Sequence, residues 1–269
     1  MNTLIQYAAG VSEGFCALAL PLVVQSIAVL ALIWAVDAIV GARISVRGRY
    51  WLWVGGLLGS ILPFSWFLPI PKMLHARVGY PIFTLPAVLM LAWFIGMAGL
   101  TWAVLRRTLQ LQAIARQAAP AGGFMQGVFR YCRRSMAVDV EVCLKISPQV
   151  ESPVVWGLRR PVILLPQDFA PRLGSRHLRA VLLHQFARIK RGDLRINLLQ
   201  MVMQVVWFFN PLIWLANARI RTLRGRLADE MVLAVMDNHL GWYSEALATV
   251  STPPADNPNP SLTTALVGI

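Results

Sequence analysis

The stretch that decides the fold is SRHLRAVLLHQFARIKRGD, residues 175–193. Ser175 is of a residue type that caps the start of helices, so a helix is expected to begin there. This helix carries apolar side chains that give it enough apolar surface to lie against a sheet: Leu178, Val181, Leu182, Leu183 and Ile189. The stretch therefore predicts a helix packed against neighbouring strands.

The centre of this helix reads HQFAR, residues 184–188. In the metal-binding pattern HExxH, two His one helical turn apart bind Zn²⁺, and the Glu activates the metal-bound water. Here Gln185 stands in the place of the Glu, and Arg188 stands in the place of the second His. His177 lies seven residues before His184, a separation of about 10 Å along a helix, which is too far for both to bind one ion. One ligand of the pattern therefore remains, and no metal is expected.

Composition places the chain in a membrane. Of its residues 57% are hydrophobic and 14% are charged. A bilayer core of about 30 Å takes about 20 helical residues to cross, and three uncharged stretches are long enough: residues 14–36, 50–71 and 78–105. The first is too long to be a cleaved signal peptide and no basic residue precedes it. Three transmembrane helices are therefore predicted over residues 1–107, with Asp37 as a solvated carboxylate at the end of the first helix.

Arginines indicate which side of the predicted spans faces the cytoplasm. Glu13 is the charged residue before the first span, whereas the loop over residues 43–49 holds three arginines, and Arg106 and Arg107 end the third span. Because positive charge marks the cytoplasmic side, we expect a multi-pass protein with its N-terminus outside and its C-terminal part in the cytoplasm. The same bias and contact with anionic membrane lipids explain the net charge of +13. Nucleic acid is therefore not an expected partner.

A change of composition marks a second region. Residues 108–127 are rich in Gln, Ala, Gly and Pro and predict a connecting arm. Residues 138–146 alternate between apolar and polar side chains and predict a strand. Short apolar runs bounded by Gly and Pro predict two more strands at 154–156 and 161–166. A small sheet of hairpin-linked strands ahead of helices is expected in a compact domain over residues 128–250.

A further uncharged stretch, residues 196–218, is bordered by Arg195 and Arg219. Hydropathy alone predicts a fourth span, but polar residues interrupt the stretch and Asn210-Pro211 breaks a helix near its middle. A helical hairpin that dips into the cytoplasmic leaflet and returns explains why arginines border both ends. A full crossing of the membrane is the alternative.

Several segments match one known family in their order and spacing. They are residues 152–157, 160–166, 182–184, 190–194, 209–214 and 228–234. Together they resemble the antirepressor metallopeptidases of the BlaR/MecR type, integral-membrane peptidases that sense β-lactams in some bacteria. The resemblance covers most of residues 80–250. It implies a predominantly α-helical integral protein of the bacterial cytoplasmic membrane, with a cytoplasmic, gluzincin-like α+β domain made of a small β-sheet and helices.

The resemblance also implies a role for four positions. In such a family two His and a downstream Glu bind zinc, and the motif Glu is the general base. His184 matches the first ligand, Gln185 the general base, Arg188 the second ligand and Gly225 the third. A neutral amide cannot take a proton from water, a guanidinium repels Zn²⁺, and glycine has no side chain. If Glu230 were the third ligand instead, Gln185 and Arg188 would still be unexplained. No catalytic residue is therefore expected, and zinc is expected to be absent.

Loss of zinc raises the question of what holds the motif helix to the downstream helix. In the family the metal would cross-link the two helices, so its loss weakens their docking unless another interaction replaces it. We hypothesise that Arg188 pairs with Asp229 or Glu230 across the empty site. The alternative is that Arg188 points to solvent or to lipid phosphates.

Two classes of function remain. In the first, a pseudopeptidase binds a protein partner through its sheet edge, its vacant cleft or its membrane face, as a regulatory, scaffold or partner-binding subunit of a membrane complex in signal transduction. In the second, an active metallopeptidase cleaves a cytoplasmic repressor or regulator. The missing ligands favour the first class. A transporter or channel has little support, because no buried charge pair or repeat is visible. Residues 251–269 form a Pro- and Asn-rich tail, and its last apolar stretch, residues 261–269, is too short to cross a membrane.

Overall fold

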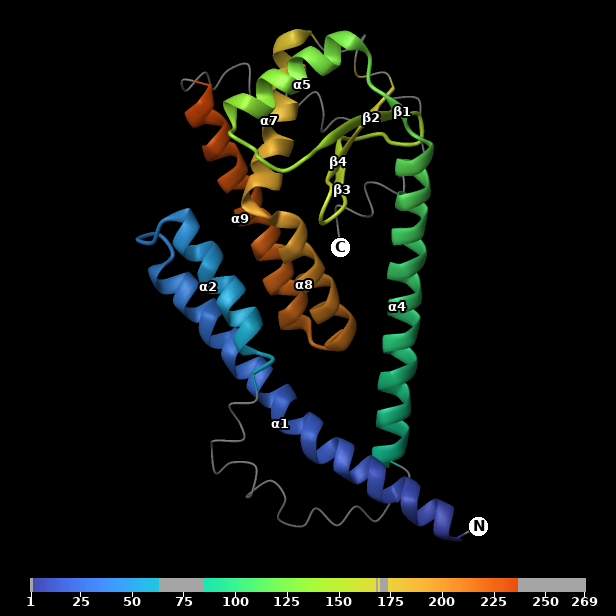
Figure 1. Cartoon of the computed structure of the whole chain (residues 1–269). Helices are drawn as coiled ribbons and strands as arrows, with labels where there is room; N and C mark the ends of the chain where they lie inside the picture. The colour runs from blue at the N-terminus through green and yellow to red at the C-terminus, as the bar shows by residue number, and fades with distance from the viewer. Residues whose placement is uncertain (1, 63–84, 168, 170–173, 237–269) are drawn as a thin grey trace. The chain divides into compact units, whose positions relative to one another are not determined.

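The computed structural model describes residues 2–62, 85–167, 169 and 174–236. Over these residues the chain is mostly helical and holds one small sheet, as the sequence predicts (Figure 1). The chain divides into two compact units. The first comprises residues 1–103 and 202–223, and the second comprises residues 104–201 and 224–269.

The first unit is helical. Its elements are α1 (Asn2–Val40), α2 (Val46–Gly59), the first part of α4 (Leu85–Gln117), the end of α8 (Asp193–Val206) and the first half of α9 (Pro211–Val235). Among the residues that the structure describes, two stretches are long and apolar enough to cross a membrane, Gly14–Val40 and Ala87–Gln117. The second predicted span, 50–71, is described only to residue 62, where α2 covers its first part; residues 78–84 of the third span also lie outside the described residues.

Helices α1 and α2 pack closely where Gly56 of α2 meets Ile33 of α1. A Cβ atom at Gly56 would lie 2.7 Å from Cγ1 of Ile33, so a larger residue would push the two helices apart. Other large side chains of these two helices are buried as well: Leu30, Tyr50, Trp53, Val54 and Leu57. Ser45 starts α2 as its N-cap, because its hydroxyl accepts a hydrogen bond from the Gly48 backbone N–H at 3.2 Å.

Asp37 is buried, so the expectation of a solvated carboxylate is wrong. Its side chain is 6% exposed. Arg49 of α2 donates to it through Nε at 2.6 Å and Nη2 at 3.1 Å, and Arg219 of α9 donates through Nε at 3.1 Å. The pattern of α1 alone could not reveal this burial, because both arginines come from other helices of the first unit.

The second unit contains a four-stranded sheet in the order β1-β2-β4-β3. The strands are β1 (Ala119–Pro120), β2 (Cys143–Ser147), β3 (Val154–Trp156) and β4 (Val162–Pro166). Strands β3 and β4 are antiparallel, but β2 runs parallel to β4, so the prediction that hairpins link the strands is wrong for β2. The strand predicted over 138–146 begins only at Cys143, because its partner β4 begins at Val162 directly opposite.

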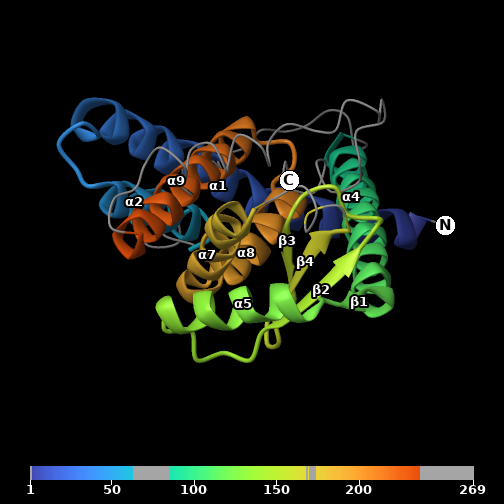
Figure 2. The same cartoon turned by 90° about the horizontal axis from the view of Figure 1, so that it is seen from above.

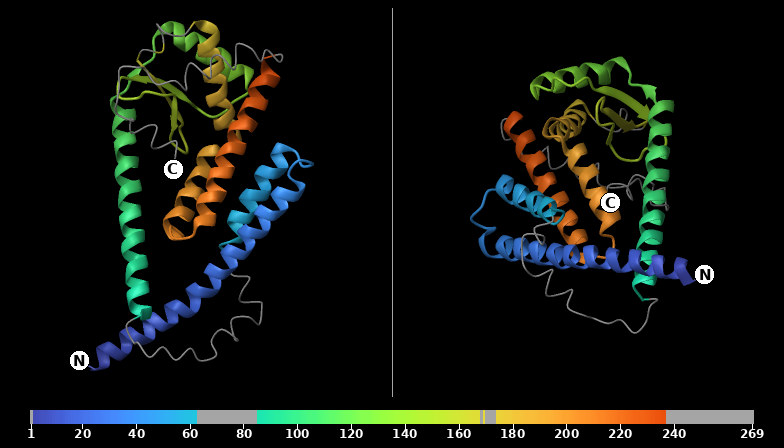
Figure 3. Two further views of the ribbon diagram at one scale, coloured as in Figure 1. Left: turned by 180° about the vertical axis from the view of Figure 1, so that it is seen from behind. Right: turned by 60° about the horizontal axis from the view of Figure 1, so that its bottom comes forward.

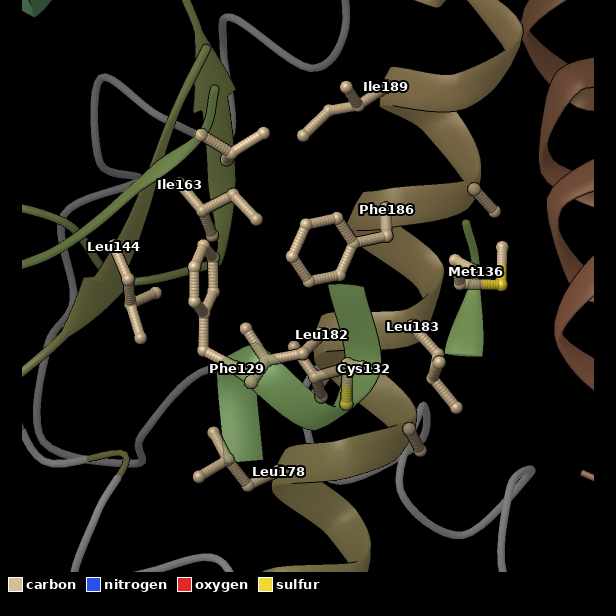
Figure 4. Close-up of a cluster of buried hydrophobic side chains, with 14 of the residues drawn as sticks. Phe129, Cys132, Met136, Leu144, Ile163, Leu178, Leu182, Leu183, Phe186 and Ile189 are labelled. Carbon is tan, nitrogen blue, oxygen red and sulfur yellow. The ribbon is translucent and has the colours of Figure 1, made fainter. Parts of the chain in front are cut away.

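One face of the sheet packs against α5 (Gly123–Ser135) and α7 (Ser175–Arg191). Side chains of a strand alternate between its two faces, and those on this face are Leu144, Val155, Ile163 and Leu165. Figure 4 shows this core, in which the rings of Phe129 from α5 and Phe186 from α7 lie with centroids 5.1 Å apart. The helix predicted around HQFAR is thus confirmed as α7, with Gly174 as the N-cap, one residue before the predicted cap.

The other face of the sheet packs against the end of α4, as the view in Figure 2 shows. This second core includes Ala115, Ala118, Val150, Val154, Val162 and Leu164. The Lys145 Nζ also donates to the Ala115 carbonyl oxygen at 2.8 Å. Within the arm predicted over 108–127, α4 continues to Gln117 and α5 begins at Gly123. Gln and Ala are strong helix formers, and the sheet buries one side of this last part of α4.

A break before Pro211 separates α8 from α9, where the sequence predicts the turn of a helical hairpin. Helix α8 ends at Val206, and Figure 3 shows α8 and α9 running back along one another from this turn. Asn210 is buried in the turn, and its Nδ2 donates to Oγ of Ser26 in α1 at 2.9 Å. Three of the polar residues that interrupt the apolar stretch, Gln204, Asn210 and Asn217, are therefore buried within the first unit.

Candidate functional site

His184 lies in the middle of α7, and its side chain contacts α9. The His184 Nδ1 lies 3.3 Å from Oδ1 of Asp229, and these side chains are 18% and 37% exposed. A neutral imidazole with its proton on Nδ1 donates to a carboxylate. The structure therefore links the motif helix to the downstream helix through a His–Asp contact.

Two contacts show that α7 and α9 run antiparallel along one another. His184 contacts Asp229, whereas Arg191, seven residues further along α7, donates through Nη2 to the Arg224 carbonyl oxygen at 2.8 Å. As residue numbers rise along α7, their partners' numbers fall along α9. One helical turn beyond His184 is Arg188, and one turn before Asp229 is Gly225. The register thus places Arg188 at the level of Gly225, the two positions that the resemblance assigns to the second and third zinc ligands.

Arg188 does not form the bridge that we hypothesised. Its Nη1 donates to Oε1 of Gln185 at 3.3 Å, while Asp229 contacts His184 and Glu230 is exposed. Asp229 lies a full turn from the level of Arg188, which explains why His184 and not Arg188 contacts it. Burial lowers the pKa of the Arg188 guanidinium, since it removes water from the charge; nearby Asp193 counteracts this effect.

A buried charge cluster at the end of α7 was missed by the sequence reasoning. Arg191 donates to Asp193 through Nε at 2.7 Å and through Nη2 at 2.5 Å, and Asp193 is 3% exposed. The guanidinium of Arg224 donates through Nη1 to the Asp193 carbonyl oxygen at 3.3 Å. Arg191 and Asp193 belong to the segment 190–194, which resembles the family. That resemblance is the sequence feature that could have indicated the cluster. The cluster fixes the register of α7 against α9 and so positions the candidate site.

The donor set at these positions does not fit zinc. A tetrahedral zinc site needs several imidazole, thiolate or carboxylate ligands around one point. His184 offers one imidazole, whose Nδ1 contacts Asp229, so that its other ring nitrogen is the one that could bind a metal. Arg188 brings a positive charge to the place of the second ligand. Within the described ranges no group of three His, Cys, Asp or Glu side chains converges to hold a metal ion. His177 lies on α7 two turns before His184 and is half-buried.

Comparison with known proteins assigns the chain to a family. The family described as BlaR1 peptidase M56 matches residues 80–267. The Regulatory protein BlaR1 of Bacillus licheniformis is 29% identical over 149 residues, which cover 55% of this chain and 25% of that protein. The Methicillin resistance mecR1 protein of Staphylococcus aureus is 20% identical over 153 residues, which cover 56% of this chain and 26% of that protein. The chain thus spans about a quarter of the length of these curated relatives. Because the family match extends over more than half of its residues, the chain belongs to the BlaR1 peptidase M56 family.

Proposed function

We propose that this chain is a catalytically inactive member of its family, serving as a regulatory, scaffold or partner-binding subunit of a membrane complex. The observation that carries the proposal is the donor set, because within the described residues no three His, Cys, Asp or Glu side chains converge at the matched positions on α7 and α9. Gln185 supports it, because its amide is neutral and cannot act as a general base. Arg188 supports it as well, because a guanidinium cannot bind Zn²⁺ as a ligand.

A regulatory role is supported by the name of one relative, which is called a regulatory protein. The other relative is called a methicillin resistance protein. This chain matches about a quarter of each, so the partner or signal of the relatives does not transfer to it directly. We therefore propose regulation through a bound protein partner.

The outer strand β3 is the part of the sheet that we propose for partner binding. It forms one edge of the sheet, pairs with β4 on its inner side, and contacts α7. An edge strand presents backbone N–H and C=O groups that can pair with an extended segment of another protein. A partner strand added there would lie beside the helix that carries His184.

We propose a membrane placement for the first unit from the contacts of the α8–α9 hairpin. Helix α8 has 14 residues, about 21 Å in length, which is too short to cross a core of about 30 Å. The turn residue Asn210 bonds Ser26, near the middle of the candidate span Gly14–Val40, and Arg219 at the base bonds Asp37 near its end. A hairpin that enters the cytoplasmic leaflet and returns fits these contacts, with the N-terminus outside and the C-terminal part in the cytoplasm.

Elemental analysis of the purified full-length protein tests the proposal of inactivity. The matched control is a Gln185→Glu, Arg188→His, Gly225→Glu variant, which restores the three side chains that the family resemblance implies. We expect the native chain to contain little zinc and the restored variant to contain about one equivalent, because only the variant has the required ligands.

The alternative function predicts a different result. If the native chain is an active metallopeptidase that cleaves a cytoplasmic regulator, it will contain stoichiometric zinc bound by His184 and other residues. The His184→Ala variant would then lose that zinc. Such a result would overturn the pseudopeptidase proposal, and loss of zinc in this variant would identify the metal centre.

A further inference from the structure

The Arg188 guanidinium makes no direct contact with a carboxylate among the residues that the structure describes. Its hydrogen-bond partner is the neutral Gln185 side chain, at 3.3 Å. The carboxylate of Asp193 acts on Arg188 from nearby, but Arg191 already holds both of its oxygens. A guanidinium has five N–H donors, and the bond to Gln185 uses one of them. A hydrogen bond from this half-buried group to an anion is stronger than one to a neutral acceptor.

Open space lies beside Gly225, on the helix that faces Arg188. A Cβ atom built at Gly225 would meet no atom within 4 Å. The antiparallel register places this glycine at the level of Arg188, between the His184–Asp229 contact on one side and the Arg191–Arg224 contact on the other. The register therefore places this space at the level of Arg188, between two contacts of α7 with α9.

We propose that Arg188 receives a carboxylate of a bound protein partner in the space beside Gly225. The planar guanidinium matches a carboxylate through two parallel hydrogen bonds, which gives such a pair both strength and direction. A partner segment paired with the β3 edge would pass close to α7, so an acidic side chain or a terminal carboxylate could reach this site. The inference rests on the proposed function, in which the site binds a partner and no metal.

A carboxylate supplied from Gly225 itself tests whether the space and the guanidinium match. We compare Gly225→Glu with Gly225→Gln, because both side chains have nearly the same size and helix propensity and differ in charge. Gly225→Glu should raise the thermal midpoint above that of Gly225→Gln by on the order of 2–4 °C, and Arg188→Gln should abolish this difference. Equal midpoints of the two variants in the native background would overturn the proposal, and this comparison does not require the Arg188 variant to fold.

Acetate is the probe for a free carboxylate. At constant ionic strength with chloride as reference, acetate should raise the midpoint of the native protein, but not that of Arg188→Gln or Gly225→Glu. Arg176→Gln is the matched control, since Arg176 is exposed on the same helix, and it should respond like the native protein. Stabilisation that persists in Arg188→Gln, or no stabilisation of the native protein, would refute the site.

Two further measurements separate the possible failures. Zinc content of the same preparations reports on the proposed function, so zinc in the native chain would overturn that function whatever acetate does. Once acetate binds, peptides with an internal Glu and an amidated end can be compared with peptides that have a free C-terminus. The class of peptide that competes with acetate identifies the source of the carboxylate, a Glu side chain or a chain terminus. If neither class competes, the assignment to a protein partner is overturned.

Discussion

Asp37 has an environment that its neighbours in the sequence do not predict. Its carboxylate is buried and accepts hydrogen bonds from Arg49 and Arg219, so it joins α1, α2 and α9. Removing one member of a buried charge cluster leaves the opposite charge without compensation, which costs about 3–5 kcal/mol in fully buried pairs. Arg219 is 36% exposed, which lowers the expected cost here toward the bottom of that range.

Asp37→Asn should therefore lower the thermal midpoint of the purified protein markedly. The neutral amide keeps the size of the side chain but leaves two guanidinium groups without their anion. Asp139→Asn is the control, because Asp139 is exposed, and it should change the midpoint little. Similar midpoints for the two variants would show that the three-helix charge cluster does not stabilise the first unit.

The contact between His184 and Asp229 can be measured by a double-mutant cycle. His184→Ala and Asp229→Ala should each lower the unfolding midpoint, and the double variant should be little worse than either single variant. A coupling of about 0.5–1.5 kcal/mol is expected for one partly exposed hydrogen bond. Additive effects would mean that this contact does not hold α7 to α9. An Arg188–Asp229 cycle should be additive, since the structure does not bring these two side chains together.

Burial should make Cys132 chemically inert. Removal of its thiol from water raises its pKa to about 12, and the charge of Arg179 counteracts this only in part. Between the ordinary thiol pKa and about 12, the Cys132 thiol therefore keeps its proton in the folded protein but loses it in the unfolded chain. The resulting contribution to the free energy of unfolding is fully present below the ordinary thiol pKa and is lost as pH rises towards 12. Iodoacetamide at mildly alkaline pH should alkylate the exposed Cys143 and spare Cys132, as read by mass spectrometry. Equal alkylation of both in the folded protein would contradict this.

At the scale of elements, the α8–α9 hairpin is defined by polar contacts inside an apolar stretch. Asn210 bonds Ser26 at the turn, and Gln204 accepts from Asn217 between the two helices at 3.4 Å. In a membrane such bonds satisfy polar groups that lipid cannot, so they bind helices together. The hairpin is thus fixed against α1 at its turn and, through Arg219, at its base.

Cysteine reporters on both sides of the hairpin test whether it returns to the side from which it enters. In a Cys143→Ser background, Arg195→Cys and Thr222→Cys place exposed thiols before and after it. Both should react with a membrane-impermeant maleimide in inside-out vesicles and be protected in intact spheroplasts. Reaction of the two reporters from opposite faces would show a full crossing instead.

At the scale of the whole molecule, the distribution of arginines sets the expected orientation. Residues 43–49, which include the start of α2, hold three arginines, and basic segments beside a span stay on the cytoplasmic side. Ala42→Cys, exposed in the loop between α1 and α2, should therefore react with the same impermeant maleimide from the same side as Arg195→Cys. Reaction of Ala42→Cys from the outer face would reverse the proposed orientation of the first span.

Local features of this protein could be predicted from its sequence because their causes are local. The helix around HQFAR, the strands near 154–156 and 161–166, and the break at Asn210-Pro211 follow from side-chain periodicity and from the backbone limits of Gly and Pro. The chemistry of Gln185 and Arg188 is likewise a property of the residues themselves. These features place the candidate site on one helix without any tertiary information.

Features that need contacts between distant residues were decided only by the tertiary structure. The parallel pairing of β2 with β4, the burial of Asp37 by two arginines, and the choice of His184 as partner of Asp229 each join segments from separate parts of the chain. The sequence named Asp229 as a partner but assigned it to Arg188, because it could not supply the register between α7 and α9. That register depends on the buried Arg191, Asp193 and Arg224 cluster, and it is the register that brings the cation of Arg188 to the open space beside Gly225.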